Sequence, residues 1–197
     1  LDKAHYIVVE GPIGAGKTSL ARRLAERLQS ETLFEQAAHN PFLSRFYQDP
    51  ERWAMATQLS FLYQRMDQLA ALGPIGEERR LVSDFIIDKD RLFAAQNLST
   101  DELALYQRIH DDIKPARTTQ PDLVVYLQAR PERLMERIRK RGLDAERHIT
   151  EAYLQQIADR YTRYFYQYEA APLFIVDAGQ LNPVDNDEDF EMLLARL

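Results

Sequence analysis

A glycine-rich run near the N-terminus constrains the fold of this 197-residue chain more than any other feature. Residues 11–18 read Gly-Pro-Ile-Gly-Ala-Gly-Lys-Thr and fit the pattern G-x-x-x-x-G-K-[ST]. An apolar run over 7–9 precedes the pattern, and leucines at four-residue spacing follow it within 19–28. A strand therefore enters the run and an amphipathic helix leaves it, which is the setting of a loop that binds the phosphates of a nucleoside triphosphate.

The residue types in this phosphate-binding loop (residues 11–18) suit a triphosphate such as ATP together with Mg²⁺. Glycines allow the backbone to turn so that successive N–H groups face the β-phosphate. Lys17 supplies a positive charge for the β- and γ-phosphates, and Thr18 supplies a hydroxyl for Mg²⁺. The residues expected to bind the nucleotide are Gly11, Pro12, Ile13, Gly14, Ala15, Gly16, Lys17, Thr18 and Ser19.

The rest of the chain predicts an α/β fold of three layers. Helical patterns separate five short apolar runs, which predict a five-stranded parallel sheet with helices on both faces. We expect one domain over residues 1–197, with a turn at residues 73–76. The predicted strands cover residues 6–10, 32–34, 81–87, 123–127 and 173–177.

Composition excludes several classes of protein. The net charge of −6 argues against general binding to nucleic acid, and the longest apolar runs, of about five residues, are too short to cross a membrane. The chain has no cysteine, which excludes thiol nucleophiles, cysteine-ligated metals and disulfides and is compatible with a reducing cytoplasm. Together these features predict a cytoplasmic enzyme.

A basic segment over residues 133–141 predicts a second anion-binding element. Arg133, Arg137 and Arg141 are spaced by four residues and therefore share one face of a helix. Their mutual repulsion is relieved when an anion lies among them, and guanidinium groups suit phosphate oxygens. We predict an arginine-bearing lid that covers a transferring phosphoryl group, while a solvated charged face is the alternative interpretation.

Two acids lie at the ends of predicted strands, where the ligands of open α/β sheets bind. Asp84 follows two apolar residues, an arrangement that can hold Mg²⁺ but can also cap the next turn. Glu35 follows the second strand and could take a proton from an acceptor hydroxyl. Taken alone, Glu35 is one acid among 31, and a surface position is its default interpretation.

Five segments carry a resemblance to a known family. They are residues 7–18, 40–47, 91–94, 137–142 and 184–190. Together they are similar to the deoxynucleoside kinase family, most closely to its bacterial deoxyadenosine/deoxyguanosine kinase branch. The resemblance implies a P-loop kinase fold with a lid at about 133–147. It also implies transfer of phosphate from ATP to the 5′-hydroxyl of a deoxynucleoside, with a purine as the predicted base, and a homodimer.

The resemblance gives roles to individual residues. It implies that Glu35 is the general base, that Lys17, Arg137 and Arg141 act on the phosphates, and that Asp185 lies in a loop around the adenine of ATP. Gln58 and Arg65 match the pair that recognises the base, and Tyr47, Trp53 and Phe61 are candidates to stack on it. The predicted substrate-binding residues are Glu35, Tyr47, Gln58, Arg65, Asp84, Asp88, Arg91 and Glu146, with Glu146 on the 3′-hydroxyl; Thr18 and Asp84 are the predicted metal ligands.

The chain departs from the family pattern after its third predicted strand. Relatives usually have Glu-Arg-Ser there, whose arginine contacts the 5′-oxygen and the transferring phosphate. Here the segment reads Ser83-Asp84-Phe85, followed by Asp88, Lys89 and Arg91. Either Lys89 or Arg91 can supply the missing charge. In the lid, Leu143 stands where many relatives carry another arginine.

Two other functions fit the phosphate-binding loop. A nucleoside-monophosphate kinase would need cations for its acceptor phosphate, and Arg45, Arg65 and Arg91 are candidates for that role. A regulatory nucleotide switch is the second alternative, but the chain contains no Asn-Lys-x-Asp run of the kind that reads guanine.

Overall fold

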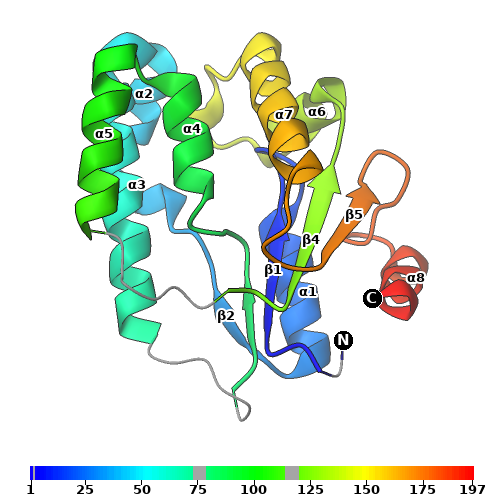
Figure 1. Ribbon diagram of the computed structural model, residues 1–197. Coiled ribbons are helices and arrows are strands. Elements are labelled where there is room, and N and C mark those ends of the chain that lie inside the picture. Colours follow the sequence, from blue (N-terminus) through cyan, green and yellow to red (C-terminus); the bar gives the residue numbers. More distant parts are fainter. Residues whose placement is uncertain (2, 73–78, 114–119) are drawn as a thin grey trace.

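A parallel sheet of five strands forms the centre of the protein (Figure 1). The computed structural model describes residues 1, 3–72, 79–113 and 120–197, so the turn predicted at 73–76 lies outside the described residues. The strand order is β2-β3-β1-β4-β5, and every pair is parallel, as the sequence predicts. The strands are β1 (Tyr6–Glu10), β2 (Glu31–Leu33), β3 (Leu81–Ser83), β4 (Leu123–Gln128) and β5 (Leu173–Asp177).

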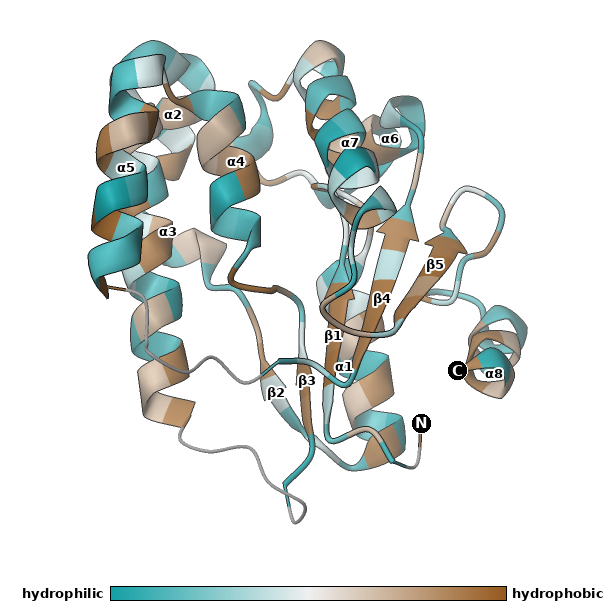
Figure 2. Cartoon of the chain, viewed as in Figure 1, coloured by the Kyte–Doolittle hydropathy of each residue, from teal (hydrophilic) through white to brown (hydrophobic). Residues whose placement is uncertain are grey.

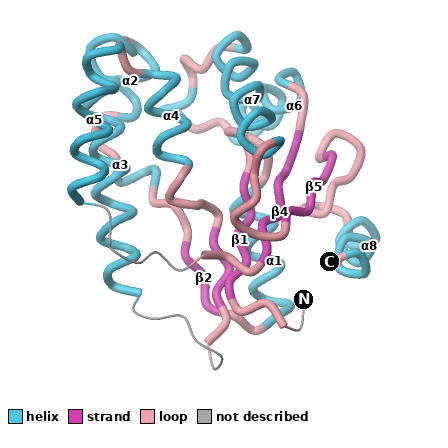
Figure 3. Tube along the Cα trace, in the orientation of Figure 1, coloured by secondary structure: helices cyan, strands magenta, loops and turns pink. Residues whose placement is uncertain are grey.

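Helices lie on both faces of this sheet, which confirms the predicted three-layer α/β fold. Helices α1, α6 and α8 pack on one face, and α4, α7 and the end of α3 pack on the other. In Figures 1 and 3, α2, α3, α4 and α5 stand together on the β2 side of the sheet. The helices are α1 (Lys17–Leu28), α2 (Leu43–Gln48), α3 (Pro50–Leu72), α4 (Lys89–Asn97), α5 (Thr100–Ile113), α6 (Pro131–Arg141), α7 (Glu151–Tyr166) and α8 (Asp187–Arg196), with short 3-10 turns at Ala37–His39 and Asp144–Glu146.

The central strands are apolar because both of their faces are covered (Figure 2). In β1, Ile7 and Val9 pack toward α1, whereas Tyr6 and Val8 pack toward α7. Successive side chains of a strand point to opposite faces, so this division follows from the strand geometry. The carboxyl ends of β1, β2 and β3 therefore meet at one edge of a fixed core.

The third strand is shorter than predicted. The prediction covers residues 81–87, but β3 ends at Ser83. There the Ser83 hydroxyl accepts the N–H of Phe85 at 3.2 Å and donates to the Phe85 carbonyl at 2.9 Å, which turns the chain out of the sheet. Phe85 and Ile86 are buried in the core although they lie outside the strand, which explains why the apolar run extends beyond Ser83. The second strand also differs from its prediction, by one residue.

The apolar faces of residues 54–72 and 101–113 pack against one another within the chain. Leu62 and Met66 of α3 share a cluster with Tyr106 of α5 and Ala94 of α4. Intramolecular packing accounts for most of the apolar character that the sequence shows there. None of the described helices is long and apolar enough to span a membrane.

Candidate active site

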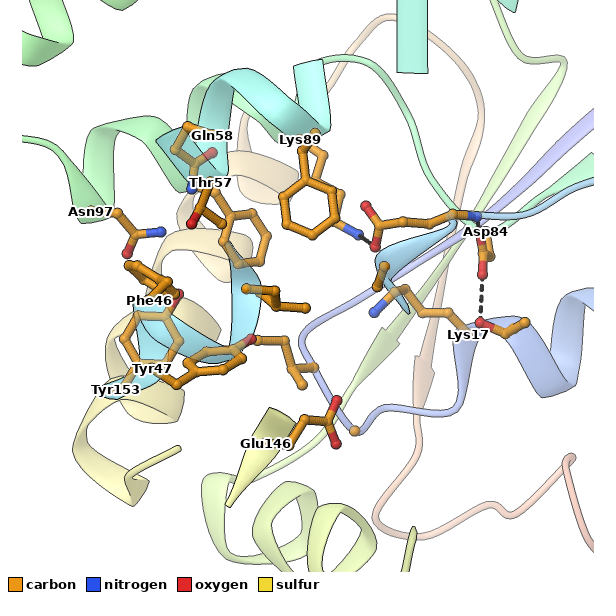
Figure 4. A pocket seen from close by; sticks show the side chains of 18 of the residues that line it. Lys17, Phe46, Tyr47, Thr57, Gln58, Asp84, Lys89, Asn97, Glu146 and Tyr153 are labelled. Atoms are coloured by element: carbon orange, nitrogen blue, oxygen red, sulfur yellow. Dashed lines mark hydrogen bonds and ion pairs between the residues drawn. The ribbon is translucent and has the colours of Figure 1, made fainter. Parts of the chain in front are cut away.

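A pocket of about 150 Å³ opens at the carboxyl edge of the sheet, between the phosphate-binding loop and helices α2, α3 and α4 (Figure 4). Segments far apart in the sequence contribute to its wall. Gln58 and Glu146 lie at opposite ends of the labelled side chains in Figure 4, with Lys17 and Asp84 on a third side. The predicted site residues that line the pocket are Ile13, Gly14, Lys17, Thr18, Glu35, Tyr47, Gln58, Arg65, Asp84, Arg141 and Glu146.

The phosphate-binding loop is held in place by close packing of its backbone. Gly11 has φ 153°, and a Cβ atom there would lie 2.5 Å from the carbonyl oxygen of Leu127. Gly14 has φ 84°, and a Cβ there would lie 2.8 Å from the carbonyl of Leu134 in α6. Only glycine fits both positions, so the two neighbouring elements fix the loop at the start of α1.

Asp84 connects the phosphate-binding loop to the segment that carries Glu35. One of its carboxylate oxygens accepts the Thr18 hydroxyl, and the other accepts the backbone N–H of Glu35 at 2.7 Å. Thr18 and Asp84 bring together oxygen ligands of the kind that Mg²⁺ prefers, so the donor set fits the predicted metal. Among the described residues no group of three or more acidic, His or Cys side chains could hold a metal ion, so Thr18 and Asp84 would hold Mg²⁺ together with phosphate oxygens and water.

Glu35 is surrounded by cations. Lys89 Nζ lies 3.0 Å from Glu35 Oε2, and Arg65 forms an ion pair with Oε1. Burial alone would raise the pKa of Glu35, but Lys89, Arg65 and Lys17 hold that pKa well below its usual range. The side chain is therefore a carboxylate throughout the neutral pH range, as an acceptor of protons must be.

Arg65, which pairs with Glu35, also forms an ion pair with a second carboxylate, that of the fully buried Asp90. Asp88, rather than Asp90, is the acid that the sequence predicts here, but Asp88 is not among the residues that line the pocket. Asp88 accepts the Tyr164 hydroxyl at 3.3 Å and lines a different cavity. Residues two apart on a helical turn point in different directions, so Asp90 faces Arg65 while Asp88 faces α7.

The first turn of α4 also sends Lys89 and Arg91 in different directions. The sequence leaves both as candidates for the charge that the family's arginine usually supplies. Arg91 is half exposed, donates to Asp111 at 2.7 Å and is not among the residues that line this pocket, so the structure does not bring it to the other predicted substrate-binding residues. Lys89 is 5% exposed and lines the pocket. Arg45 lies over the Trp53 ring at 4.9 Å and also lies outside the pocket.

The far end of the pocket combines a glutamine amide with aromatic side chains. Gln58 is buried, lines the pocket, and its amide makes no hydrogen bond within the described part of the chain. Tyr47 and Phe61 also line the pocket, as proposed for stacking residues. Trp53 does not, because its ring stacks on Phe42 at 5.9 Å. Asn97 and Tyr153 line the pocket as well, and the sequence patterns alone do not single them out.

The arginines of α6 have separate partners rather than one shared anion site. Arg137 donates to the carbonyls of Ala15, at 3.1 Å, and Ala178, at 2.7 Å. Arg141 forms a bidentate ion pair with Glu146 at the pocket rim, and the two closest N–O distances are 2.6 and 2.8 Å. Of the predicted lid arginines, Arg141 therefore borders the pocket, whereas Arg137 braces the phosphate-binding loop.

A second cavity, of about 290 Å³, lies behind the lid helix. It is lined by Arg137, by Asp185 and by residues of the loop after β5. Val184 of that loop lies 3.1 Å from the position that a Cβ atom would take at Gly16, so the loop itself packs against the phosphate-binding loop. Asp185 lines this cavity, and its role in a loop around the adenine of ATP stays a prediction.

Comparison with known proteins agrees with this arrangement. The family model described as deoxynucleoside kinase matches residues 7–197. The chain belongs to the deoxynucleoside kinase family. Among its relatives, the deoxyguanosine kinase of Bacillus subtilis is 30% identical, with 100% of this chain and 98% of the relative covered. The deoxyadenosine kinase of Lactobacillus acidophilus is 31% identical, with 91% and 88% covered.

Solved structures give the same fold. The deoxyadenosine kinase of M. mycoides, solved with dATP bound, has a TM-score of 0.83 and 23% identity, with 98% of each chain covered. A second structure of that enzyme, with dCMP and a flexible dCDP, has a TM-score of 0.83 and 24% identity, with 97% of each chain covered. The protein is accordingly a deoxynucleoside kinase, and the P-loop kinase fold expected from the sequence is confirmed.

The charge of Lys17 makes nucleotide binding dependent on pH. Burial and the nearby ammonium group of Lys89 lower the pKa of Lys17 to about 8. A triphosphate favours the charged lysine, so binding raises this pKa. We expect the Kd for ATP to be nearly constant below pH 8 and to rise above it by up to about tenfold per pH unit. Calorimetric titrations from pH 7 to 10 measure this change, and Lys17→Met should bind weakly with no such slope.

Proposed function

We propose that this kinase transfers the γ-phosphoryl group of ATP to the 5′-hydroxyl of a purine deoxynucleoside, with Glu35 as the general base. The observation that carries the proposal is a partly buried carboxylate, that of Glu35, which lines the same pocket as the lysine of the phosphate-binding loop. Mg²⁺, when held by Thr18 and Asp84, would neutralise charge on the phosphates. Arg141 at the rim would add positive charge as the lid segment closes.

Purine selection is assigned to Gln58 and Arg65. A glutamine amide offers one acceptor and two donors, which suits the edge of adenine, while a guanidinium offers donors to the oxygen and nitrogen acceptors of guanine. Arg65 is held by Asp90, so its direction is fixed before substrate arrives. The relatives named deoxyguanosine and deoxyadenosine kinase support the same choice.

A substrate panel tests the proposal. Radiolabelled phosphate transfer from ATP is measured to the four deoxynucleosides and to dAMP and dTMP. We expect kcat/KM to be highest for deoxyadenosine or deoxyguanosine, and Gln58→Leu to lower it by about 10- to 200-fold because the base edge loses its partner. Gln64→Leu on the same helix is the control, because Gln64 lies outside the pocket. Faster transfer to a monophosphate than to any nucleoside would contradict the proposal.

Glu146 is proposed to bind the 3′-hydroxyl of the sugar. Its carboxylate lines the pocket while Arg141 holds it from the other side. We expect Glu146→Gln to lower kcat/KM for a deoxynucleoside by about tenfold or more, because a charge-assisted hydrogen bond is lost. The same variant should change kcat/KM much less for the 2′,3′-dideoxynucleoside, which has no 3′-hydroxyl. Equal losses with both substrates would remove Glu146 from the sugar site.

A monophosphate acceptor, the first alternative from the sequence, lacks support in the pocket. Its candidate arginines are engaged: Arg65 with Asp90 and Glu35, Arg91 with Asp111, and Arg45 against Trp53. We also propose a cytoplasmic homodimer. Support for the dimer comes from α3 and α5, where Tyr63 and Leu105 are each 51% exposed. Sedimentation velocity would test it.

A further inference from the structure

The acceptor side of the pocket contains a buried lysine to which the proposed function gives no role. Lys89 is the first residue of α4 and is 5% exposed. Its side chain projects from that helix into the pocket, and its ammonium group points toward the same space as that of Lys17 (Figure 4). Burying an ammonium group is unfavourable unless anions compensate for the lost hydration, so its partners indicate its purpose.

Two carboxylates of different kinds compensate for Lys89. Glu10 is fully buried and lies 4.0 Å from the ammonium group. Its oxygens already accept the N–H of Gly11 at 2.8 Å, the hydroxyl of Tyr161 at 2.9 Å and the N–H of Ile86 at 3.3 Å. Glu10 is therefore a fixed anion that retains Lys89 without using up its donors.

The closer partner of Lys89 is Glu35, at 3.0 Å. If Glu35 receives a proton during the reaction, this ion pair loses its negative member. The ammonium group then has three donors and no mobile anion next to it. The other cations that line this side of the pocket are engaged elsewhere, because Arg65 also binds Asp90 and Arg141 binds Glu146. Protonation of Glu35 removes a partner from both Lys89 and Arg65, but Arg65 keeps its direct ion pair with Asp90, whereas Lys89 keeps only Glu10 at 4.0 Å.

We propose that Lys89 is a catalytic residue that passes from the Glu35 carboxylate to the oxygens of the phosphoryl group as that group reaches the acceptor. The inference rests on the proposed function. The acceptor 5′-hydroxyl gives its proton to Glu35 while its oxygen bonds to the γ-phosphorus. The bond from that phosphorus to the β,γ-bridging oxygen breaks, and ADP leaves with the electron pair. The positive charge of Lys89 remains throughout and balances the new phosphate monoester.

Steady-state kinetics and product binding test this role. We expect Lys89→Gln and Lys89→Met to lower kcat on the order of 10²- to 10³-fold, as loss of one transition-state donor does, with KM for the nucleoside within about threefold. Calorimetry should show affinity for the deoxynucleoside monophosphate at least tenfold weaker, with nucleoside affinity within threefold. Lys89→Arg should restore part of kcat, and Arg108→Gln, an exposed charge removal on α5, is the matched control.

Other outcomes would overturn the proposal. A purely structural lysine would weaken nucleoside and monophosphate binding alike, and an unchanged kcat in a folded Lys89→Gln protein would exclude catalysis by this residue. If neither neutral variant folds, the ¹³Cε signal of Lys89 in the parent enzyme, assigned with Lys89→Arg, decides the matter. It should move with saturating monophosphate and not with nucleoside, and no movement refutes the role. A parent enzyme that phosphorylates no deoxynucleoside would instead refute the proposed function.

Discussion

Glu35→Gln is expected to lower kcat for deoxynucleoside phosphorylation on the order of 10²- to 10⁴-fold, the usual contribution of a positioned general base. The amide keeps the shape of the side chain but accepts no proton at neutral pH. Binding of the nucleoside, measured by calorimetry, should change by less than about fivefold, because the pocket walls remain. Rates are measured with deoxyadenosine and deoxyguanosine at saturating ATP.

The control for this variant lies at the start of β2, the strand that leads to Glu35. Glu31 of β2 is exposed and pairs with Arg79 at the surface, so Glu31→Gln removes a carboxylate of the same segment without touching the pocket. Its kcat should equal that of the parent enzyme. Comparable turnover by Glu35→Gln and Glu31→Gln would show that another group receives the proton.

The low pKa of Glu35 bears on how it works. A carboxylate held ionised by Lys89 and Arg65 is a weak base toward an alcohol. Phosphoryl transfer has a loose transition state in which little proton transfer is needed early, so a weak base is sufficient. Protonation of Glu35 should therefore cause no loss of rate above pH 5 in the pH–rate profile.

Arg65→Met and Asp90→Asn are expected to be the most destabilising single substitutions in the site. Both side chains are buried, and Arg65→Met leaves the Asp90 carboxylate as an uncompensated buried charge, which costs about 3–5 kcal/mol of unfolding free energy. We expect a smaller loss for Asp90→Asn, because Arg65 keeps its ion pair with Glu35. Urea denaturation followed by circular dichroism measures this loss. The double variant Arg65→Met/Asp90→Asn should lose clearly less than the sum of the two single losses, because neither residue is then left as a buried charge.

A surface pair provides the comparison for this cycle. Arg91 and Asp111 also form an ion pair at 2.7 Å, but both side chains are more than half exposed. Asp111→Asn should leave the urea midpoint nearly unchanged, since water replaces the lost partner. Additive losses in the Arg65/Asp90 cycle would show that burial does not couple the two residues.

The sequence predicts the parts of this enzyme that are set by local pattern. The phosphate-binding loop depends on its own glycines, and the parallel sheet depends on apolar runs that are covered on both faces, so both are readable from a single chain. Glu35 is different, because its position beside Lys89 arises only when β2 and α4 meet at the sheet edge. Only the family resemblance gave it a role before the fold was known.

The errors cluster where the phase of a helix decides which side chain faces the pocket. The Ser83–Phe85 turn ends β3 early and sets where α4 begins. A shift of one or two residues in that start exchanges Asp88 for Asp90 and Arg91 for Lys89. An apolar run over residues 81–87 is compatible with one long strand and also with a short strand followed by a buried turn. The sequence pattern therefore does not determine where α4 begins or which of its side chains face the pocket.

Asp84 provides a physical connection between the donor site and the acceptor site. Its two oxygens tie the hydroxyl of Thr18 to the backbone that carries Glu35. Any ligand that draws this carboxylate toward the donor side must also adjust the acceptor side. Because such linkage is reciprocal, the factor by which a filled donor site changes the acceptor affinity should equal the factor by which a filled acceptor site changes the donor affinity.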